Sequence, residues 1–310
     1  MSVRILTGDC LDVLRTLPDG MAQTCVTSPP YFGLRDYGHA GQIGLEDTPE
    51  AYVARLVEVF REVGRVLRDD GTLWLNLGDS YASGTKGSGG GWAADPNNYA
   101  HKAQAYGVRK YDTGGLADKQ LMGIPWRVAF ALQADGWYLR QEIIWHKPNP
   151  MPESVRDRCT KAHEQVFLLS KRARYFFDAE AIAEPGVIPA GTKAAKGSAE
   201  RASQPGVNNR PPEYKIYDGM RNRRSVWTIA TQPFSGAHFA TMPPELAETC
   251  IRAGSKSGDV VLDPFGGAGT TGLAADRLQR SATLIELNPE YAAIARDRIT
   301  ADAPLLRAAE

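Results

Sequence analysis

The fold is decided near the C-terminal end of the chain, by the stretch Val260-Val261-Leu262-Asp263-Pro264-Phe265-Gly266-Gly267-Ala268-Gly269-Thr270-Thr271. Its apolar start predicts a buried strand, and its glycines let the backbone turn sharply and approach a ligand before a helix begins. Glu286 follows Asp263 by 23 residues, the usual separation for a carboxylate that binds ribose hydroxyls. A glycine-rich loop that serves packing alone would look similar, so the motif needs support from elsewhere in the chain.

The chemistry of this loop favours a cationic ligand. Asp-Pro-Phe stands where dinucleotide-binding loops carry their first glycine. A carboxylate suits a pyrophosphate poorly, because both are negative. S-adenosylmethionine carries an ammonium and a sulfonium and no phosphate, so the loop favours it as cofactor and disfavours a nicotinamide oxidoreductase.

Strands and helices alternate on both sides of the chain's centre. Apolar runs predict strands at 3–6, 24–27, 72–77, 138–145, 165–169, 259–263 and 282–286. Helical spacing predicts helices that begin near 11, 48, 120, 270 and 289. This alternation predicts an α/β fold, with a parallel sheet covered on both faces.

A second motif, Thr27-Ser28-Pro29-Pro30-Tyr31, follows the strand predicted at 24–27. Ligands of open α/β sheets bind at the carboxyl ends of the strands, where this motif lies. Two prolines remove backbone donors and leave carbonyl acceptors, the serine hydroxyl accepts and donates, and the tyrosine ring can stack. These groups suit an exocyclic amino group on a planar ring. A simple proline turn is the alternative, and the cofactor loop at the same edge argues against it.

Together the two motifs resemble those of the amino-group (N4-cytosine/N6-adenine) DNA methyltransferases, in the β-type order in which the catalytic motif precedes the cofactor loop. The resemblance extends to segments 7–10, 76–79, 145–149 and 238–243. It implies a Rossmann-like, S-adenosylmethionine-dependent methyltransferase sheet, circularly permuted, with an inserted target-recognition region. The catalytic core would comprise 1–185 and 226–310, with 186–225 as the target-recognition region and 83–115 as a loop over DNA or cofactor.

The resemblance also implies roles for individual residues. The catalytic residues would be Ser28, Pro29, Pro30 and Tyr31. The residues that bind S-adenosyl-L-methionine would be Asp9, Cys10, Asp263, Pro264, Phe265, Gly266, Gly267, Gly269, Thr270 and Glu286. Asp9 also fits a helix N-cap, and Thr270 and Thr271 fit caps of the following helix.

The implied reaction is methyl transfer to the N4 amino group of a flipped cytosine in double-stranded DNA. Serine at the first position of the tetrapeptide favours cytosine N4, with adenine N6 as the alternative. A protein or small-molecule amino or amide methyltransferase is a further alternative, and a catalytically silent DNA-binding module is a rival of another class.

Charge is distributed in a way that fits a DNA partner. The 310 residues contain 36 basic and 36 acidic side chains, yet residues 86–224 hold 22 basic against 14 acidic. The DNA contacts would come from the basic residues of the inserted region and its end: Lys193, Lys196, Arg210, Lys215, Arg221, Arg223 and Arg224. A solvated loop is the alternative reading of this segment.

Composition and spacing set the remaining expectations. Four scattered cysteines and no apolar run long enough to span a bilayer predict a cytoplasmic protein without a membrane partner. The histidines show no metal-ligand spacing, so no metal is expected. The chain would act as a monomer or homodimer, and a cognate restriction endonuclease is a possible partner.

Overall fold

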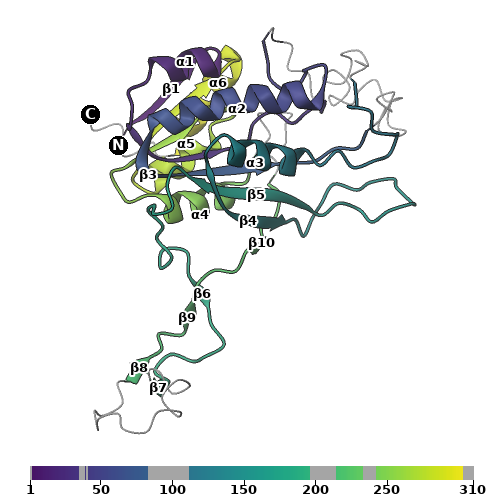
Figure 1. Ribbon diagram of the computed structural model, residues 1–310. Helices are drawn as coiled ribbons and strands as arrows, with labels where there is room; N and C mark the ends of the chain where they lie inside the picture. The colour runs from purple at the N-terminus through teal and green to yellow at the C-terminus, as the bar shows by residue number, and fades with distance from the viewer. Residues whose placement is uncertain are drawn as a thin grey trace. The chain divides into compact units, whose positions relative to one another are not determined.

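The computed structural model describes residues 2–34, 39, 41–82, 112–195, 214–232 and 242–302. They form two compact units, one of residues 1–177 and 225–310 and the other of residues 178–224. The first unit is built on an eight-stranded sheet (Figure 1). Across the sheet the order is β1 (Val3–Thr7), β12 (Ser281–Glu286), β11 (Val260–Asp263), β2 (Ala22–Thr27), β3 (Leu67–Leu77), β5 (His163–Ser170), β4 (Tyr138–His146) and β10 (Val226–Thr228).

The sheet is mixed rather than wholly parallel. Strands β1, β12, β11, β2 and β3 pair in parallel, as the alternation of strands and helices predicts. Strand β5 is antiparallel to both β3 and β4, and β10 pairs in parallel with β4. The parallel sheet predicted from the alternating flanks is therefore confirmed for β1, β12, β11, β2 and β3, and β4 and β5 pair antiparallel because they follow one another without a crossover helix.

Helices cover the sheet in two layers (Figure 1). The layer on one face consists of α1 (Cys10–Thr16), α2 (Pro49–Val66) and α3 (Ile124–Ala134). The other layer consists of α4 (Pro244–Gly254), α5 (Thr270–Arg277) and α6 (Pro289–Asp302). A sheet buried on both faces explains why every residue of β2 is buried. None of the helices in the described residues is long and apolar enough to cross a membrane.

Local chemistry explains where several elements begin. Thr48 caps α2 by accepting a hydrogen bond from the Ala51 amide at 3.0 Å. Helix α3 starts four residues later than predicted, after Gly123 in the left-handed region and with Pro125 in its first turn. Strand β3 starts at Leu67, five residues earlier than predicted. The sequence patterns predict neither helix α4 nor strand β10.

The second unit contains two short antiparallel ribbons. One pairs β6 (Glu184–Pro185) with β9 (Met220–Arg221), and the other pairs β7 (Lys193–Ala195) with β8 (Tyr214–Ile216). The unit starts eight residues before the predicted target-recognition region and ends one residue before its end. Most of the loop at 83–115 lies outside the described residues, as do Lys196, Arg210 and the segment 233–241.

Candidate active site

The two sequence motifs meet at the centre of the sheet. Strand β11 lies beside β2, and from this pair the connections run outward in opposite directions, to β12 on one side and to β3 on the other. Such a switch point opens a crevice at the carboxyl edge of the sheet. Thr27, the last residue of β2, donates a buried hydrogen bond of 2.6 Å from its hydroxyl to Oδ1 of Asp263. This contact fixes the loop at 28–31, predicted to be catalytic, against the loop at 263–269, predicted to bind the cofactor.

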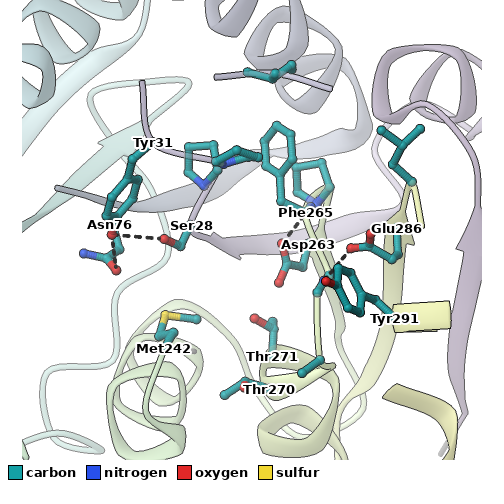
Figure 2. A pocket seen from close by; sticks show the side chains of 18 of the residues that line it. Ser28, Tyr31, Asn76, Met242, Asp263, Phe265, Thr270, Thr271, Glu286 and Tyr291 are labelled. Atoms are coloured by element: carbon teal, nitrogen blue, oxygen red, sulfur yellow. Dashed lines mark hydrogen bonds between the residues drawn. The ribbon is translucent and has the colours of Figure 1, made fainter. Parts of the chain in front are cut away.

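Asp263 is buried, lines the cavity and holds the two loops together through its hydrogen bonds. Its Oδ1 accepts a second hydrogen bond, of 3.0 Å, from the Phe265 amide, which shapes the start of the loop (Figure 2). Burial raises the pKa of Asp263, and the hydrogen bonds from Thr27, Thr271 and Phe265 oppose that rise. The predicted role of Asp263 in binding S-adenosylmethionine stays a prediction.

Backbone amides hold Glu286 on the cofactor side of the crevice. The Gly267 amide donates to Oε2 and the Asn288 amide to Oε1, each at 2.8 Å (Figure 2). Burial raises the pKa of Glu286. Each carboxylate oxygen has a further lone pair, so the pair could also accept hydrogen bonds from two ribose hydroxyls. Phe265 and Tyr291 supply aromatic rings to the same cavity.

The glycine-rich turn leads into α5 without a side-chain cap. Gly269 has a φ of 77°, and a Cβ there would lie 2.8 Å from the Ala295 Cβ, so glycine is required on both grounds. Thr270 accepts a hydrogen bond of 2.9 Å from Arg298, and Thr271 donates to the Val26 carbonyl at 3.2 Å. The alternative reading of these threonines as helix caps is therefore wrong.

Asp9 and Cys10 line the same cavity at the start of α1. Asp9 caps this helix by accepting from the Leu11 and Asp12 amides at 2.9 and 3.1 Å. Burial, aided by the Asp9 charge, raises the pKa of Cys10 to about 12. The N-cap role of Asp9 is confirmed, and the predicted binding of S-adenosylmethionine by both residues stays a prediction.

Packing beneath the catalytic loop leaves little freedom to Pro30 and Tyr31. The Tyr52 hydroxyl donates to the Pro30 carbonyl at 2.9 Å. The Tyr31 ring lies against Gly78, where an added Cβ would come within 2.8 Å of the ring Cδ2 and closer still to Cε2. These contacts fix the backbone of the loop beside the cavity that Ser28 and Pro29 line.

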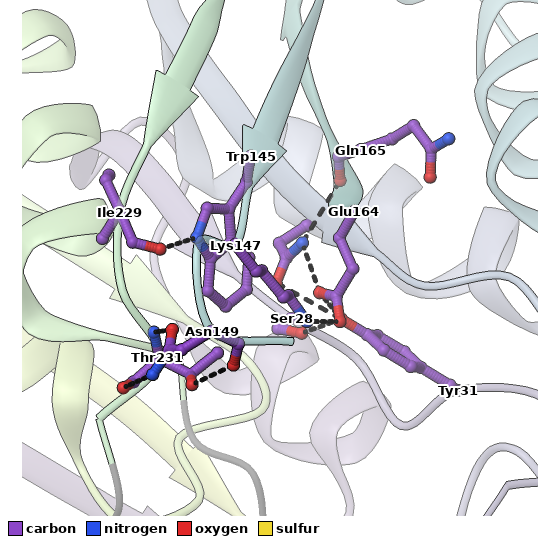
Figure 3. Close-up of polar contacts among 10 residues, drawn as sticks. Ser28, Tyr31, Trp145, Lys147, Asn149, Glu164, Gln165, Ile229 and Thr231 are labelled. Carbon is purple, nitrogen blue, oxygen red and sulfur yellow. Dashed lines mark hydrogen bonds and ion pairs between the residues drawn. The ribbon is translucent and has the colours of Figure 1, made fainter. Parts of the chain in front are cut away.

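A polar network that sequence reasoning did not predict lies beside this loop (Figure 3). The Tyr31 hydroxyl donates to Oε2 of Glu164 at 2.8 Å and lies 3.3 Å from Oδ1 of Asn76 and from the Ser28 hydroxyl. The Asn76 amide donates to the same Glu164 oxygen at 3.1 Å. Lys147 forms an ion pair with the other oxygen of Glu164, and its Nζ lies 4.3 Å from the centre of the Trp145 ring.

Hydrogen bonds between the ends of β4 and β10 fix the position of Trp145, next to this network. Trp145 donates from its indole nitrogen to the Ile229 carbonyl at 2.8 Å. Asn149 exchanges two hydrogen bonds with the backbone of Thr231, of 2.9 and 3.2 Å (Figure 3). These contacts join the segment after β4 to the segment after β10.

The residues that sequence reasoning missed are brought to the site by strand register. Asn76 and Lys147 lie in segments that carry the family resemblance, but no sequence pattern gives either of them or Glu164 a role. Asn76 faces Val166 across the β3–β5 pair, and Trp145 faces Glu164 across the β4–β5 pair. The one local signal for Glu164 is a carboxylate directly before the strand predicted at 165–169.

One cavity of about 330 Å³ joins both halves of the site. Glu286, Gly267 and Phe265 line it on the cofactor side, and Tyr31 and Glu164 line it on the other. Ser28 and the two prolines line it in between, as Figure 2 shows for Ser28. The arrangement can therefore bring a ligand of the glycine-rich loop against a second, planar ligand at Ser28.

The second unit holds the described part of the predicted DNA-binding set. Arg221 and Arg224 both pair with Oε1 of Glu184, at 2.9 and 2.5 Å. Lys193 is exposed on β7, and Lys215 lies on β8 opposite Ala194. Arg223 is half-buried. The acidic Glu184 thus offsets part of the positive charge that the sequence shows.

Comparison with known proteins identifies the family of the chain. A model of the N6/N4 DNA methylase family matches residues 22–297. The chain is 50% identical over 295 residues to the Type II methyltransferase M.XycI of Xanthomonas campestris pv. cyanopsidis, covering 95% of this chain and 87% of the relative. It is 47% identical to M.SmaI of Serratia marcescens, covering 96% and 91%.

Solved structures share the fold. The structure of TTHA0409 from Thermus thermophilus, complexed with S-adenosyl-L-methionine, is similar with a TM-score of 0.61 and 26% identity, covering 98% of this chain and 95% of that one. The PvuII cytosine-N4-specific DNA methyltransferase has a TM-score of 0.64 at 19% identity, covering 97% and 91%. At that identity the likeness concerns the fold alone.

The chain belongs to the N6/N4 DNA methylase family. It is an S-adenosylmethionine-dependent DNA methyltransferase of the class that modifies the exocyclic amino group of cytosine or adenine.

Proposed function

We propose that the protein methylates the N4 amino group of a cytosine flipped out of double-stranded DNA, as the modification enzyme of a Type II system. The observation that carries this proposal is the position of Ser28, between the cofactor half and the network around Glu164 in one cavity. A stacked base cannot place its amino nitrogen there, so the base must leave the helix.

The residues fit the methyl donor by their chemistry. Glu286 would hold the ribose hydroxyls, Phe265 and Tyr291 would contact the adenine, and the Asp263 end of the loop would face the methionine part. The donor supplies a methyl group on a positively charged sulfur. The protein's task is to bring a nucleophilic nitrogen into line with it and to make that nitrogen's lone pair available.

Ser28 and the neighbouring carbonyls would perform that task. The lone pair of an aromatic amino group is delocalised into its ring. Hydrogen bonds from the two N–H groups to the Ser28 hydroxyl and to the Ser28 or Pro29 carbonyl would localise it on nitrogen. The Tyr31 ring would contact the base. The side of the ring with Cδ2 and Cε2 packs on Gly78.

The choice of cytosine rests on Ser28 and on Lys147. Cytosine presents its O2 and N3 acceptors beyond the amino group, whereas adenine presents N1 and a C–H. Lys147 lines the cavity and keeps donor capacity beyond its bond to Glu164, so it could donate to O2. Adenine N6 remains the second candidate, because its amino group also lies beside a ring nitrogen.

The second unit would contact DNA outside the catalytic pocket. Its arginines at 221, 223 and 224 and its lysines at 193 and 215 would bind phosphates or read base edges. Removing the three arginine charges should weaken DNA binding and flatten its dependence on salt. An unchanged salt slope would exclude this unit as the DNA face.

The experiment that tests the function is nucleoside analysis after methyl transfer. Purified protein, S-adenosylmethionine carrying a labelled methyl group and unmethylated mixed-sequence DNA should yield labelled N4-methylcytosine. Labelled N6-methyladenine would move the assignment to the second candidate. Absence of label in DNA, with label in protein or small molecules, would overturn it. Long-read sequencing of DNA from cells that express the chain would give the sequence context.

A further inference from the structure

A chain of hydroxyl and carboxylate groups leads away from the catalytic serine. The Ser28 hydroxyl donates to the Tyr31 hydroxyl at 3.3 Å, and the Tyr31 hydroxyl donates to Oε2 of Glu164 at 2.8 Å (Figure 3). Burial and the nearby Glu164 charge raise the pKa of Tyr31 well above its ordinary value. The phenol therefore stays neutral, and a neutral phenol accepts one hydrogen bond while it donates another.

The groups around Glu164 orient its carboxylate. Asn76 donates an amide hydrogen to Oε2, and Lys147 pairs with Oε1. The pair is largely shielded from water, with side chains 16% exposed for Glu164 and 18% for Lys147. The Asn76 amide oxygen can accept a hydrogen bond but a carboxamide is not a base, and an ammonium has no lone pair, so neither group can take up a proton from the tyrosine. Among these groups the carboxylate is the proton acceptor.

The methylation of an amino group requires such an acceptor. When the amino nitrogen forms its bond to the methyl carbon, the sulfur–carbon bond breaks and the sulfonium becomes a neutral thioether. The nitrogen then carries three other bonds and a positive charge, and one of its two hydrogens must leave as a proton. An exocyclic ammonium on an electron-poor base such as cytosine or adenine is a much stronger acid than a carboxylic acid, because loss of the proton restores conjugation with the ring, so a carboxylate is a sufficient base.

We propose that Ser28, Tyr31 and Glu164 form a proton relay that carries this proton away from the target base. The proposal rests on the proposed function. The amino group gives its proton to the Ser28 oxygen, the Ser28 proton moves to the Tyr31 oxygen, and the Tyr31 proton moves to Oε2 of Glu164. Glu164 becomes neutral, the methylated amine becomes neutral, and the partly exposed carboxyl later releases the proton to water.

The relay assigns Tyr31 a second task besides contact with the base, and it makes Glu164 a residue that acts through Tyr31. Asp263 lies on the cofactor side of the crevice, where its Oδ1 accepts hydrogen bonds from Thr27 and Phe265, so it is not part of this chain of groups. The three relay groups come from the loop after β2 and from the start of β5. The antiparallel strand β5 thus contributes directly to the reaction.

Conservative variants of Glu164 separate a relay from a structural role. Glu164→Gln keeps the length of the side chain and can still accept from Tyr31 and Asn76, but it cannot take up a proton. Glu164→Asp keeps the carboxylate and shortens the chain. A relay predicts that the aspartate variant transfers methyl groups at least 10-fold faster than the glutamine variant, whereas a structural role predicts the opposite order.

The measurement is the single-turnover rate of labelled methyl transfer to unmethylated mixed-sequence plasmid DNA, with enzyme in excess. We expect Glu164→Gln and Tyr31→Phe each to lower this rate at least 10-fold with unchanged affinity for DNA and for S-adenosylmethionine. The double variant should be no slower than the slower single one. The matched controls are Glu142→Gln and Tyr138→Phe on strand β4. Tyr138 lies at the end of the β4–β5 pair far from Glu164, and Glu142 lies between the two ends.

The proposal is overturned if the single-turnover rate of Glu164→Gln is within threefold of the wild-type rate, or if it equals or exceeds the rate of Glu164→Asp. It is also overturned if the rate losses of Glu164→Gln and Tyr31→Phe multiply in the double variant. Nucleoside analysis of the wild-type product keeps this result apart from the proposed function. A product of N6-methyladenine would change the base and leave the relay test valid, since both amino groups lose a proton. A wild-type enzyme that leaves DNA unlabelled would overturn the function and the relay together.

Discussion

Gly78 should be important for methyl transfer although it is not among the residues that line the cavity. A Cβ at this position would lie 2.8 Å from Cδ2 of the Tyr31 ring and closer to Cε2. Ordinary contacts between carbon atoms are about 3.5–4.0 Å, so the ring of a Gly78→Ala variant must move by about 1 Å. Tyr31 would then lose its hydrogen bond of 2.8 Å to Glu164.

The Gly78→Ala substitution should lower both the rate of methyl transfer and the free energy of unfolding. A misplacement of about 1 Å in a catalytic group can lower a rate by about 100-fold. Overpacking of this kind destabilises a fold by about 1–3 kcal/mol. We therefore expect a single-turnover rate about 100-fold below wild type and a free energy of unfolding lower by about 1–3 kcal/mol. Cofactor affinity should be unchanged, because the cofactor half is held by β11 and β12.

The assay compares labelled methyl transfer with cofactor binding measured by calorimetry. Gly64→Ala is the control, because Gly64 lies on α2 and its nearest atom to an added Cβ is a side-chain atom of Trp137 at 3.3 Å. This control should transfer methyl groups at the wild-type rate. A Gly78→Ala enzyme within threefold of wild type, or one that loses cofactor affinity as much as rate, would refute the reasoning.

Three further predictions concern other parts of the molecule. Glu286→Ala should weaken S-adenosylmethionine binding by about 10- to 150-fold, the equivalent of about 1.5–3 kcal/mol for charge-assisted hydrogen bonds, and calorimetry that shows full affinity would contradict its role. Because burial raises the pKa of Cys10 to about 12, iodoacetamide at about pH 8 should label the exposed Cys159 and spare Cys10; equal labelling in peptide mass spectrometry would disprove this. Glu184→Gln should release the two arginines that it pairs with, tighten DNA binding and steepen its salt dependence by about 0.9 for each new phosphate contact; a weaker complex in filter-binding titrations would count against the second unit as a DNA face.

The parts of the site that could be predicted are those coded locally. Asp263, the glycines after it and Glu286 follow one another at a spacing set by one strand, one helix and the next strand. Asp9 could be predicted as a helix cap because the capping bonds join residues two and three apart in sequence. Each of these predictions depends on a single turn and its neighbours.

The base side of the site could not be predicted in the same way. Glu164 reaches Tyr31 from 133 residues away, and Asn76 reaches Glu164 from 88. Those contacts exist because β5 is inserted antiparallel between β3 and β4, which is a matter of strand order and register. No local pattern in the chain specifies that order.

The buried hydrogen bond between Thr27 and Asp263 spans 236 residues, and it shows that motif order along the chain is not what builds the site. The two loops come together because β2 and β11 are neighbours in the sheet. The helix after β2 leads to β3 and the helix after β11 leads to β12, so neither helix connects β2 to β11. A rearranged gene that encoded the β11–β12 segment first would preserve the same neighbours. Evolution can therefore reorder such enzymes, and an engineer can choose where to open the chain, without redesigning the pocket.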